Sequence, residues 1–183
     1  MPNTSRASLG ISAVLITREK EYPKDIRLDF PFDEVIVQTE CPNVLRRFEL
    51  AREARNEIIY VQDDDAAINI ATLYSHYDDR LTNAITPGHL QIYNGLCGNR
   101  VTLIGWGCFF PKRLLRVLDF YPEPLDPIEV DRIFTHLVYR QEGRHNSVVM
   151  PIRQFQRERA ICRGNPNHYR ERDALIRKLE KEL

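Results

Sequence analysis

Three short runs of apolar, β-branched residues stand out in the first third of the chain. They cover residues 11–17, 34–38 and 58–61, and each has the length of a β-strand. Residues 22–29, which contain Pro23, separate the first two runs and indicate a short helix or a turn. The pattern therefore predicts three strands in this part of the chain.

A helical pattern lies between the second and third predicted strands. It opens at Pro42-Asn43, where Asn43 is the predicted N-cap, and apolar side chains then recur at Val44, Phe48 and Ala51. Strands that alternate with helices at this spacing are typical of an α/β domain. We therefore expect a largely parallel central sheet.

Proline-containing start signals predict three further helices in the second half of the chain. They are Pro111, Asp126-Pro127 and Asn165-Pro166. The second of these signals is the strongest, because Glu129 follows the acidic cap at the position of a capping box. We expect the helix after residue 165 to be the last element.

Three other segments have simpler patterns. Residues 70–77 have helical spacing, although Ile68 and Ile70 also fit an alternating strand. Residues 101–104 are predicted as a strand, and residues 140–149 as an exposed loop.

The composition is ordinary for a soluble globular protein. Of the 183 residues, 43% are hydrophobic and 28% are charged, which argues against wholesale disorder. No apolar run approaches the roughly 20 residues of a membrane span, and residues 1–10 lack the apolar region of a secretory signal. The widely spaced cysteines, Cys41, Cys97, Cys108 and Cys162, form no CxxC pair, so we expect reduced thiols and a cytoplasmic location.

The formal net charge of zero hides an asymmetry between the two ends of the chain. Residues 140–183 hold eleven Lys and Arg against six Asp and Glu, so the remainder of the chain is acidic. This basic tail contains Arg153, Arg157, Arg159, Arg163, Arg170 and Arg172, interleaved with Phe155 and Tyr169. Arginine binds phosphates through paired hydrogen bonds, so an anionic partner near the tail is one interpretation, and a solvated helix face is the other.

Three consecutive aspartates, Asp63, Asp64 and Asp65, come directly after the third predicted strand. Adjacent carboxylates repel one another unless water or a cation screens them, and their oxygens suit hard cations such as magnesium or manganese. Ligands of open α/β sheets bind beyond the carboxyl ends of the strands. The run therefore predicts a site for a metal bound to phosphates, with a capped surface turn as the alternative.

The order of strands, helix and acidic run resembles the nucleotide-sugar-binding half of a family 2-like GT-A-type glycosyltransferase. The resemblance rests on residues 11–17, on Val35-Ile36-Val37 and on residues 60–65, where the aspartates match the DxD motif of that superfamily. Residues 105–110 (GWGCFF) are similar to the glycine-containing segment that lines the sugar pocket.

Two later positions extend the resemblance to about residues 11–170. Glu129-Val130-Asp131 resembles the acidic motif near the acceptor, and His168 resembles the C-terminal histidine that completes the metal site in many members. The resemblance implies one GT-A-like domain over residues 1–183, an α/β/α sandwich with a mostly parallel sheet and a C-terminal helix. Residues 10–110 would bind the nucleotide sugar, and residues 111–183 would form the acceptor side and the basic tail.

The resemblance also implies roles in binding a divalent ion, Mn²⁺ or Mg²⁺, and the diphosphate of the donor. Asp65 would be the direct metal ligand, Asp63 would face the ribose or a metal-bound water, and Asp64 would lie beside them. His168 would add a nitrogen ligand, which favours manganese; its alternative is a helix-cap residue.

Several residues would contact the rest of the nucleotide sugar. Thr17 and Arg18 end the first strand, Thr39 ends the second, and one of the arginines on the helix before the acidic run, Arg47, is expected to point toward the nucleotide. The other predicted contacts are Trp106 and Gly107 beside the sugar and Arg163 and Arg170 on the diphosphate. Core packing is the alternative for Trp106.

Asp131 is the candidate general base, because a carboxylate in the first turn of a helix stays ionised and can take the proton of an acceptor hydroxyl. Glu129 is the competing candidate, although a capping role explains it as well. With Asp131 as the base the reaction inverts the anomeric centre, and with Asp131 as a positioning group a retaining reaction remains open.

Two other functions compete with a glycosyltransferase that uses a hydroxyl acceptor (a glycan, a small molecule or a modified DNA base). The first is a non-enzymatic module that binds nucleic acid through the arginine-rich tail. The second is a magnesium-dependent nuclease or phosphotransferase. Against the second, the sequence lacks a Walker-type glycine loop and a second acidic cluster for a two-metal site.

Overall fold

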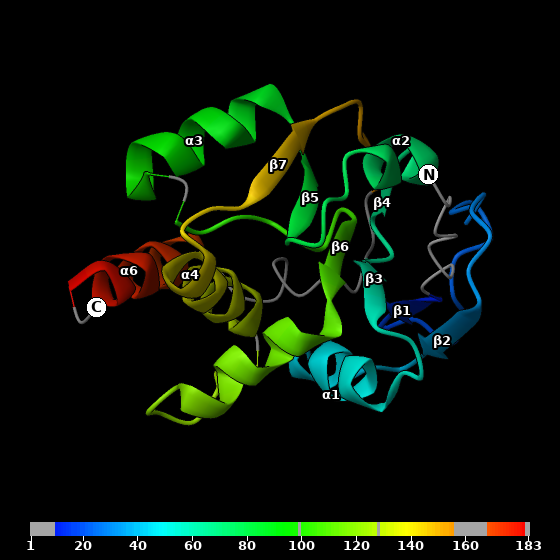
Figure 1. Ribbon diagram of the computed structural model, residues 1–183, viewed down its shortest axis with the longest axis horizontal. Helices are drawn as coiled ribbons and strands as arrows, with labels where there is room; N and C mark the ends of the chain where they lie inside the picture. The colour runs from blue at the N-terminus through cyan, green and yellow to red at the C-terminus, as the bar shows by residue number, and fades with distance from the viewer. Residues whose placement is uncertain (1–9, 99, 128, 156–167, 182–183) are drawn as a thin grey trace, which may run out of the picture.

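Six strands form one central sheet, and helices lie on both of its faces (Figure 1). The computed structural model describes residues 10–98, 100–127, 129–155 and 168–181. The strands of the central sheet are β1 (Ile11–Ile16), β2 (Glu34–Gln38), β3 (Ile58–Gln62), β5 (Thr82–Ile85), β6 (Cys108–Pro111) and β7 (Asn146–Val149). A second, two-stranded sheet pairs β4 (Ala66–Ala67) with β8 (Arg153–Gln154).

The described helices are α1 (Leu45–Glu53), α2 (Ile70–Ser75), α3 (Pro87–Cys97), α4 (Val130–Glu142), α6 (His168–Lys181) and the 3₁₀ helix η1 (Lys112–Phe120). None of the helices in the described ranges is long and apolar enough to cross a membrane.

The strand order β2-β1-β3-β6-β5-β7 makes the sheet mixed. The β1 strand pairs in parallel with β2 and β3, and β5 pairs in parallel with β7. The β6 strand lies between β3 and β5 and is antiparallel to both. The predicted α/β class is therefore confirmed, and the sheet is mixed because β6 is antiparallel to its two neighbours. The other five strands run in one direction, so their carboxyl ends share one edge of the sheet.

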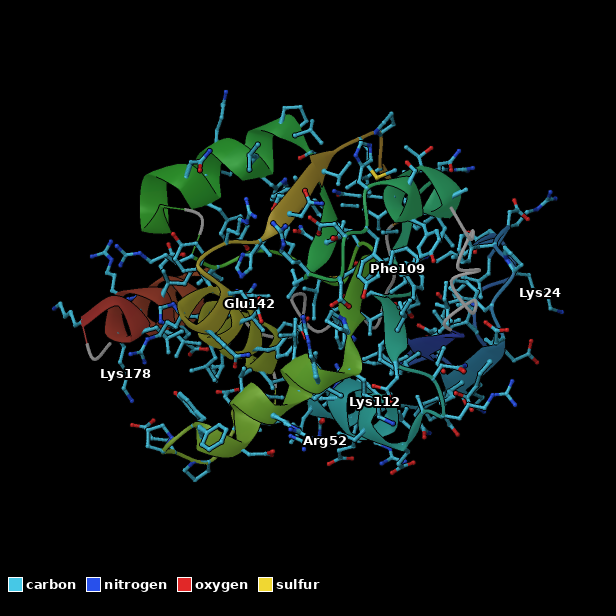
Figure 2. The ribbon with its side chains drawn as sticks, in the orientation of Figure 1. Lys24, Arg52, Phe109, Lys112, Glu142 and Lys178 are labelled. Carbon is cyan, nitrogen blue, oxygen red and sulfur yellow. The ribbon has the colours of Figure 1, made fainter. Side chains whose placement is uncertain are left out.

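Alternating side chains of the central strands build two apolar cores. Val14 of β1 faces the core under α1, η1 and α4, whereas its neighbour Leu15 faces the core under α2 and residues 22–32. The same alternation separates Phe110 from Phe109 in β6, because successive strand residues point to opposite faces. Figure 2 shows Phe109 in the interior and Lys24 and Lys178 projecting from opposite ends of the molecule.

Three predicted segments differ from the structure. Residues 101–104 are mostly buried but belong to no strand, since the amide of Thr102 donates to Thr135 Oγ1 (3.3 Å) rather than to a neighbouring strand. Residues 140–149 are not a loop, because α4 continues to Glu142 and β7 follows. The helix predicted after Pro111 is present as the 3₁₀ helix η1.

Two predicted helix starts lie a few residues before the observed ones. The α1 helix begins at Leu45, and Asn43 Oδ1 accepts a hydrogen bond from the amide of Arg46 (3.3 Å). The α4 helix begins at Val130, and Asp126 Oδ1 accepts from the amide of Glu129 (3.0 Å). Both predicted cap side chains thus bind main-chain amides, in turns that precede the helix.

Candidate functional site

Three groups of predicted site residues meet at the shared carboxyl edge of the sheet. The acidic loop, residues 63–65, follows β3, and the hydroxyl of Thr17 at the end of β1 donates to Asp64 Oδ2. The amide of Asp63 donates to the Gly105 carbonyl (2.6 Å), which holds the start of the 105–107 segment against the loop. The edge therefore brings together segments that the sequence resemblance had linked by order alone.

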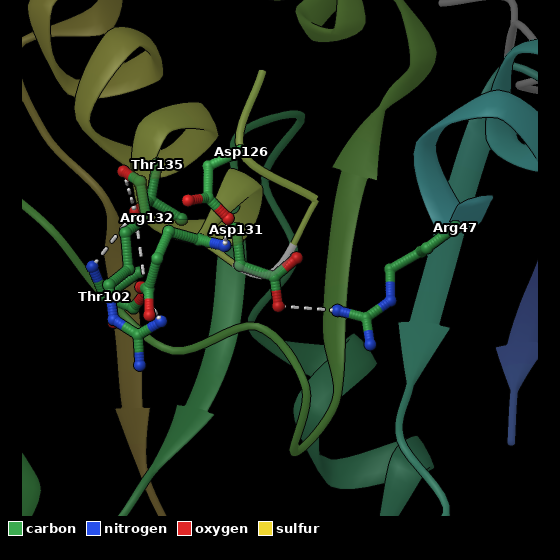
Figure 3. A network of polar contacts seen from close by, with 7 residues as sticks. Arg47, Thr102, Asp126, Asp131, Arg132 and Thr135 are labelled. Carbon is green, nitrogen blue, oxygen red and sulfur yellow. Dashed lines mark hydrogen bonds and ion pairs between the residues drawn. The ribbon is translucent and has the colours of Figure 1, made fainter. Parts of the chain in front are cut away.

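Arg47 joins this loop to the helix that carries the candidate base. Its guanidinium is fully buried: Nη2 pairs with Asp63 Oδ1, and Nη1 donates to Asp131 Oδ2 at 2.7 Å (Figure 3). The side chains of Asp63 and Asp131 are 34% and 18% exposed, respectively. Arg47 is therefore a buried bridge between two partly exposed carboxylates. A ligand could contact the two carboxylates but not Arg47 itself.

Helix packing explains why Arg47 and Asp131 meet. The amides of Val44 and Leu45, at the start of α1, both donate to the Pro127 carbonyl ahead of α4 (3.0 and 3.3 Å). The first turns of the two helices therefore lie together, with Arg47 on one and Asp131 on the other. The amino-terminal end of α4 favours the negative charge of Asp131.

Burial and charge act on Asp131 in opposite directions. Burial raises the pKa of its carboxyl group, and the Arg47 guanidinium opposes that rise. Asp131 Oδ1 and Arg47 Nε are buried and have no hydrogen-bond partner in the described ranges. The pair thus leaves one buried oxygen of the Asp131 carboxylate without a hydrogen bond, while the other binds Arg47. A raised pKa suits a general base, because the proton affinity of the carboxylate moves toward the working pH.

Glu129, the competing candidate base, is held by a different arginine. Its Oε2 accepts a hydrogen bond from Arg132 Nη1 one turn later on α4, and both side chains are buried. Arg132, its partner, lies near Thr102 and Thr135 (Figure 3), and its carbonyl accepts a hydrogen bond from Thr135 Oγ1 within α4 (3.2 Å). This arrangement explains Glu129 as a structural residue of the α4 start.

The 105–107 segment needs glycine for close approach rather than for flexibility. A Cβ atom at Gly105 would lie 2.0 Å from Asp63 Oδ2. Gly107 has a φ of +122°, and a Cβ atom there would lie 2.4 Å from Ile68 Cδ1. Trp106 between them is half-buried and meets the ring of His89 edge-on, with centroids 4.6 Å apart. The 105–107 segment therefore packs closely against the acidic loop, without room for a side chain at Gly105 or Gly107.

The other predicted nucleotide contacts are farther from the bridge or outside the described residues. Arg18 is exposed, and its Nη2 donates to the Pro42 carbonyl (3.4 Å). Thr39 follows β2, which β1 separates from β3. Arg170 is exposed on α6. Arg163 lies outside the described residues, as does the side chain of His168, whose main chain begins α6.

The residues of the acidic loop form only part of a metal site. Asp63 is paired with Arg47 and Asp64 with Thr17, and no three His, Cys, Asp or Glu side chains lie together as a metal-binding group in the described ranges. Carboxylates suit Mn²⁺ or Mg²⁺, but an ion here would need most of its ligands from a diphosphate and water. The described residues therefore fit an ion that protein and diphosphate hold together, and not one held by the protein alone.

The bridging role of Arg47 is the feature that sequence reasoning missed. Its position carried a signal, because Arg47, Phe48 and Ala51 lie on the buried side of α1, at the i+3, i+4 and i+7 positions counted from the half-buried Val44. A charged residue on a buried stripe requires a buried counter-charge. Its two partners could not be read from the pattern, since Asp131 lies 84 residues further along the chain.

The two cysteines in the described ranges whose side chains can be assessed, Cys41 and Cys108, are buried free thiols. Burial raises the pKa of the Cys108 thiol, which keeps it protonated and unreactive beside the bridge.

Comparison of the chain with protein-family models found no matching family, and comparison with curated proteins found no match either.

Proposed function

We propose that the protein is a glycosyltransferase that moves a sugar from a nucleoside-diphosphate sugar to a hydroxyl acceptor. One observation carries the proposal: the buried Arg47 bridge, which pairs with both Asp63 and Asp131. The first carboxylate belongs to the loop expected to face the donor, and the second is the expected base. Such a transfer needs the two functions side by side.

The proposed reaction assigns a separate task to each side of the bridge. The acceptor hydroxyl oxygen forms a bond to the anomeric carbon, and the bond from that carbon to the diphosphate oxygen breaks. The nucleoside diphosphate leaves with the bonding electrons, and the hydroxyl proton passes to Asp131. Arg47 holds Asp131 and Asp63 at a fixed separation, and residues 105–107 pack against the loop. When bound, a divalent ion would neutralise charge on the diphosphate, with Asp65 and His168 as the residues proposed to hold it.

A donor-hydrolysis screen tests the proposal directly. The protein is incubated with individual nucleotide sugars, with and without Mn²⁺, and the released nucleoside diphosphate is measured. We expect release from one donor, lost in Asp65→Asn and kept in Asp119→Asn, whose exposed carboxylate pairs with Arg52 on the surface. In a transfer assay, Asp131→Asn should lower kcat by about 100-fold or more, the usual contribution of a general base.

The same proteins distinguish this proposal from nucleic-acid binding. Salt-sensitive binding of an oligonucleotide that survives Asp65→Asn, together with no hydrolysis of any donor, would replace the glycosyltransferase with a tail-directed binding module. If Asp65→Asn hydrolyses the donor as fast as wild type does, the acidic loop does not take part in the reaction.

A further inference from the structure

An open groove of about 630 Å³ lies beside the small sheet formed by β4 and β8. Its lining comes from residues 67–69 and Thr72 on one side and from residues 150–153 on the other. This volume is within the range of about 300–1,000 Å³ typical of pockets for small organic ligands. No role proposed above uses this groove.

The groove adjoins the acidic loop through main-chain contacts. The β4 strand that contributes Ala67 follows Asp65 directly, and the amide of Phe155, just after β8, donates to the Asp65 carbonyl (2.7 Å). Ile68, another lining residue, packs against Gly107. A molecule in the groove would therefore lie beside the loop and the 105–107 segment that packs against it.

The sheet order separates the groove from the expected position of the nucleotide. Thr17 ends β1, on one side of β3, whereas the groove lies on the β5–β7 side, where the amide of Met150 donates to the Ile85 carbonyl (3.1 Å). A nucleotide that contacts Thr17 and extends to the acidic loop leaves the groove open for the second substrate.

The chemistry of the lining favours one kind of occupant. Ile68, Met150 and Ile152 supply apolar surface, and none of the described lining residues is a carboxylate. Arg153 is the one charged residue in the described part of the lining; it is exposed, and its guanidinium carbon lies 4.8 Å from the centre of the Phe155 ring. An apolar body with one negative group complements this combination, because arginine pairs with carboxylate, sulfate and phosphate oxygens.

We infer that this groove is the acceptor subsite and that it takes a small organic acid, with its apolar body on Ile68 and Ile152 and its anionic group on Arg153. That the bound acid is the acceptor rests on the proposed function. Binding of an organic acid in the groove can be measured without any transfer reaction.

Two fluorescent probes of similar shape test this inference. The first, 8-anilinonaphthalene-1-sulfonate, carries one negative charge, and the second, N-phenyl-1-naphthylamine, is neutral. We expect Arg153→Gln to weaken binding of the anionic probe about tenfold and to leave the neutral probe unchanged. Arg144→Gln removes an equally exposed charge outside the groove and should alter neither probe.

A second variant and a competition arm identify the position of the probe. Thr72→Phe places a ring in the groove from the exposed side of α2 and should abolish binding of both probes. Equal affinity of the anionic probe for wild type and Arg153→Gln would overturn the inference, as would displacement of the probe by a nucleoside diphosphate, which would make the groove part of the donor site. A failed donor screen together with the expected probe results would refute the proposed function while leaving the anion-binding groove in place.

Discussion

Arg47 is the residue whose charge the site depends on most. Replacing it with Met removes the counter-charge of two carboxylates while keeping most of the buried volume. We expect Arg47→Met to lower the free energy of unfolding by about 3–5 kcal/mol, the usual cost of breaking a buried pair by removing one partner. Chemical denaturation at pH 7 measures this loss.

Arg46→Met is the matched control for Arg47, since Arg46 lies next to it on α1 but pairs with Glu49 and Glu53 at the surface. Exposed pairs contribute about 0–1 kcal/mol, so this change should be small. Equal effects of the two substitutions would mean that the bridge does not stabilise the fold.

Gly105 is expected to tolerate no side chain. A methyl group there would overlap Asp63 Oδ2 and push the carboxylate away from Arg47. We expect Gly105→Ala to cost about 1–3 kcal/mol of stability, as overpacked sites do. Gly88→Ala on α3 is the control, because nothing lies within 4 Å of the added atom. Thermal unfolding of the two variants should show a lower Tm for Gly105→Ala alone.

We expect the buried side chain of His136 to make the free energy of unfolding fall in mild acid. The side chain is 2% exposed, and burial lowers its pKa from the ordinary value of 6.5 to about 4. Between these values the unfolded chain binds the proton and the folded chain does not, so stability falls as the pH drops from 6.5 toward 4. The contribution of this one group is at most about 3 kcal/mol.

The variant His136→Leu isolates that contribution, because leucine cannot take up the proton. Urea unfolding at several pH values should show a flatter dependence between pH 6.5 and 4 for this variant than for wild type. The exposed His76 gives the control His76→Gln, which should follow wild type. Parallel curves for wild type and His136→Leu would contradict the assignment.

At the scale of elements, Asn69 supplies a measurable helix cap. Its side-chain oxygen accepts a hydrogen bond from the amide of Thr72 (2.8 Å) at the start of α2. We expect Asn69→Ala to destabilise the protein by about 1 kcal/mol and Asn69→Asp, which keeps the acceptor, to restore most of the loss. A Tm of Asn69→Asp as low as that of Asn69→Ala would show that the cap is not the cause.

Three strands of the central sheet, β1, β2 and β3, could be predicted from the sequence, whereas the short strands β5, β6 and β7 could not. Strands β1, β2 and β3 match the three apolar runs closely, because each is rich in Ile and Val, which favour strands; these residues are buried in β1 and β3, whereas Val35 and Val37 of β2 are exposed. Strands β5 and β7 escaped prediction because polar residues occupy half of each strand: the half-buried Ser147 of β7 donates through Oγ to Oδ1 of the buried Asn83 of β5 (2.9 Å) across the parallel pair. A hydrogen bond between two strands satisfies groups that a hydropathy pattern assigns to a loop.

At the scale of the whole molecule, the sequence predicts where the candidate site residues lie in the fold, but not which of them pair with one another. The sequence located Asp63–Asp65 at a strand end and Asp131 in a first helical turn, and both positions are confirmed. The contacts Thr17–Asp64 and Arg47–Asp131 join residues 47 and 84 positions apart. Such pairings depend on strand order, including the antiparallel β6, which no local pattern specifies.

The common direction of five strands predicts where a ligand will act on the molecule. If nucleoside diphosphate and Mn²⁺ bind at the carboxyl edge, hydrogen exchange should slow at the amides of residues 62–66 and 104–107. Amides near the opposite ends of β1 and β3, at residues 11–12 and 57–58, should change only as far as global unfolding is suppressed. At a ligand concentration of 100 Kd, local opening that requires ligand release becomes about 100-fold rarer.

The same measurement distinguishes nucleotide binding at the carboxyl edge of the sheet from binding at the basic tail, with UDP, GDP, ADP and CDP added one at a time. Slowed exchange at residues 62–66 with one of them supports a nucleotide site on the acidic loop, and Asp65→Asn should abolish it. Slowed exchange confined to residues 170–181 would instead locate the anion on the basic tail. Residues 153–155 do not separate the two outcomes, because β8 pairs with β4 and the Phe155 amide donates to the Asp65 carbonyl, whereas α6 packs against α3 and α4 and is measured on a different peptide.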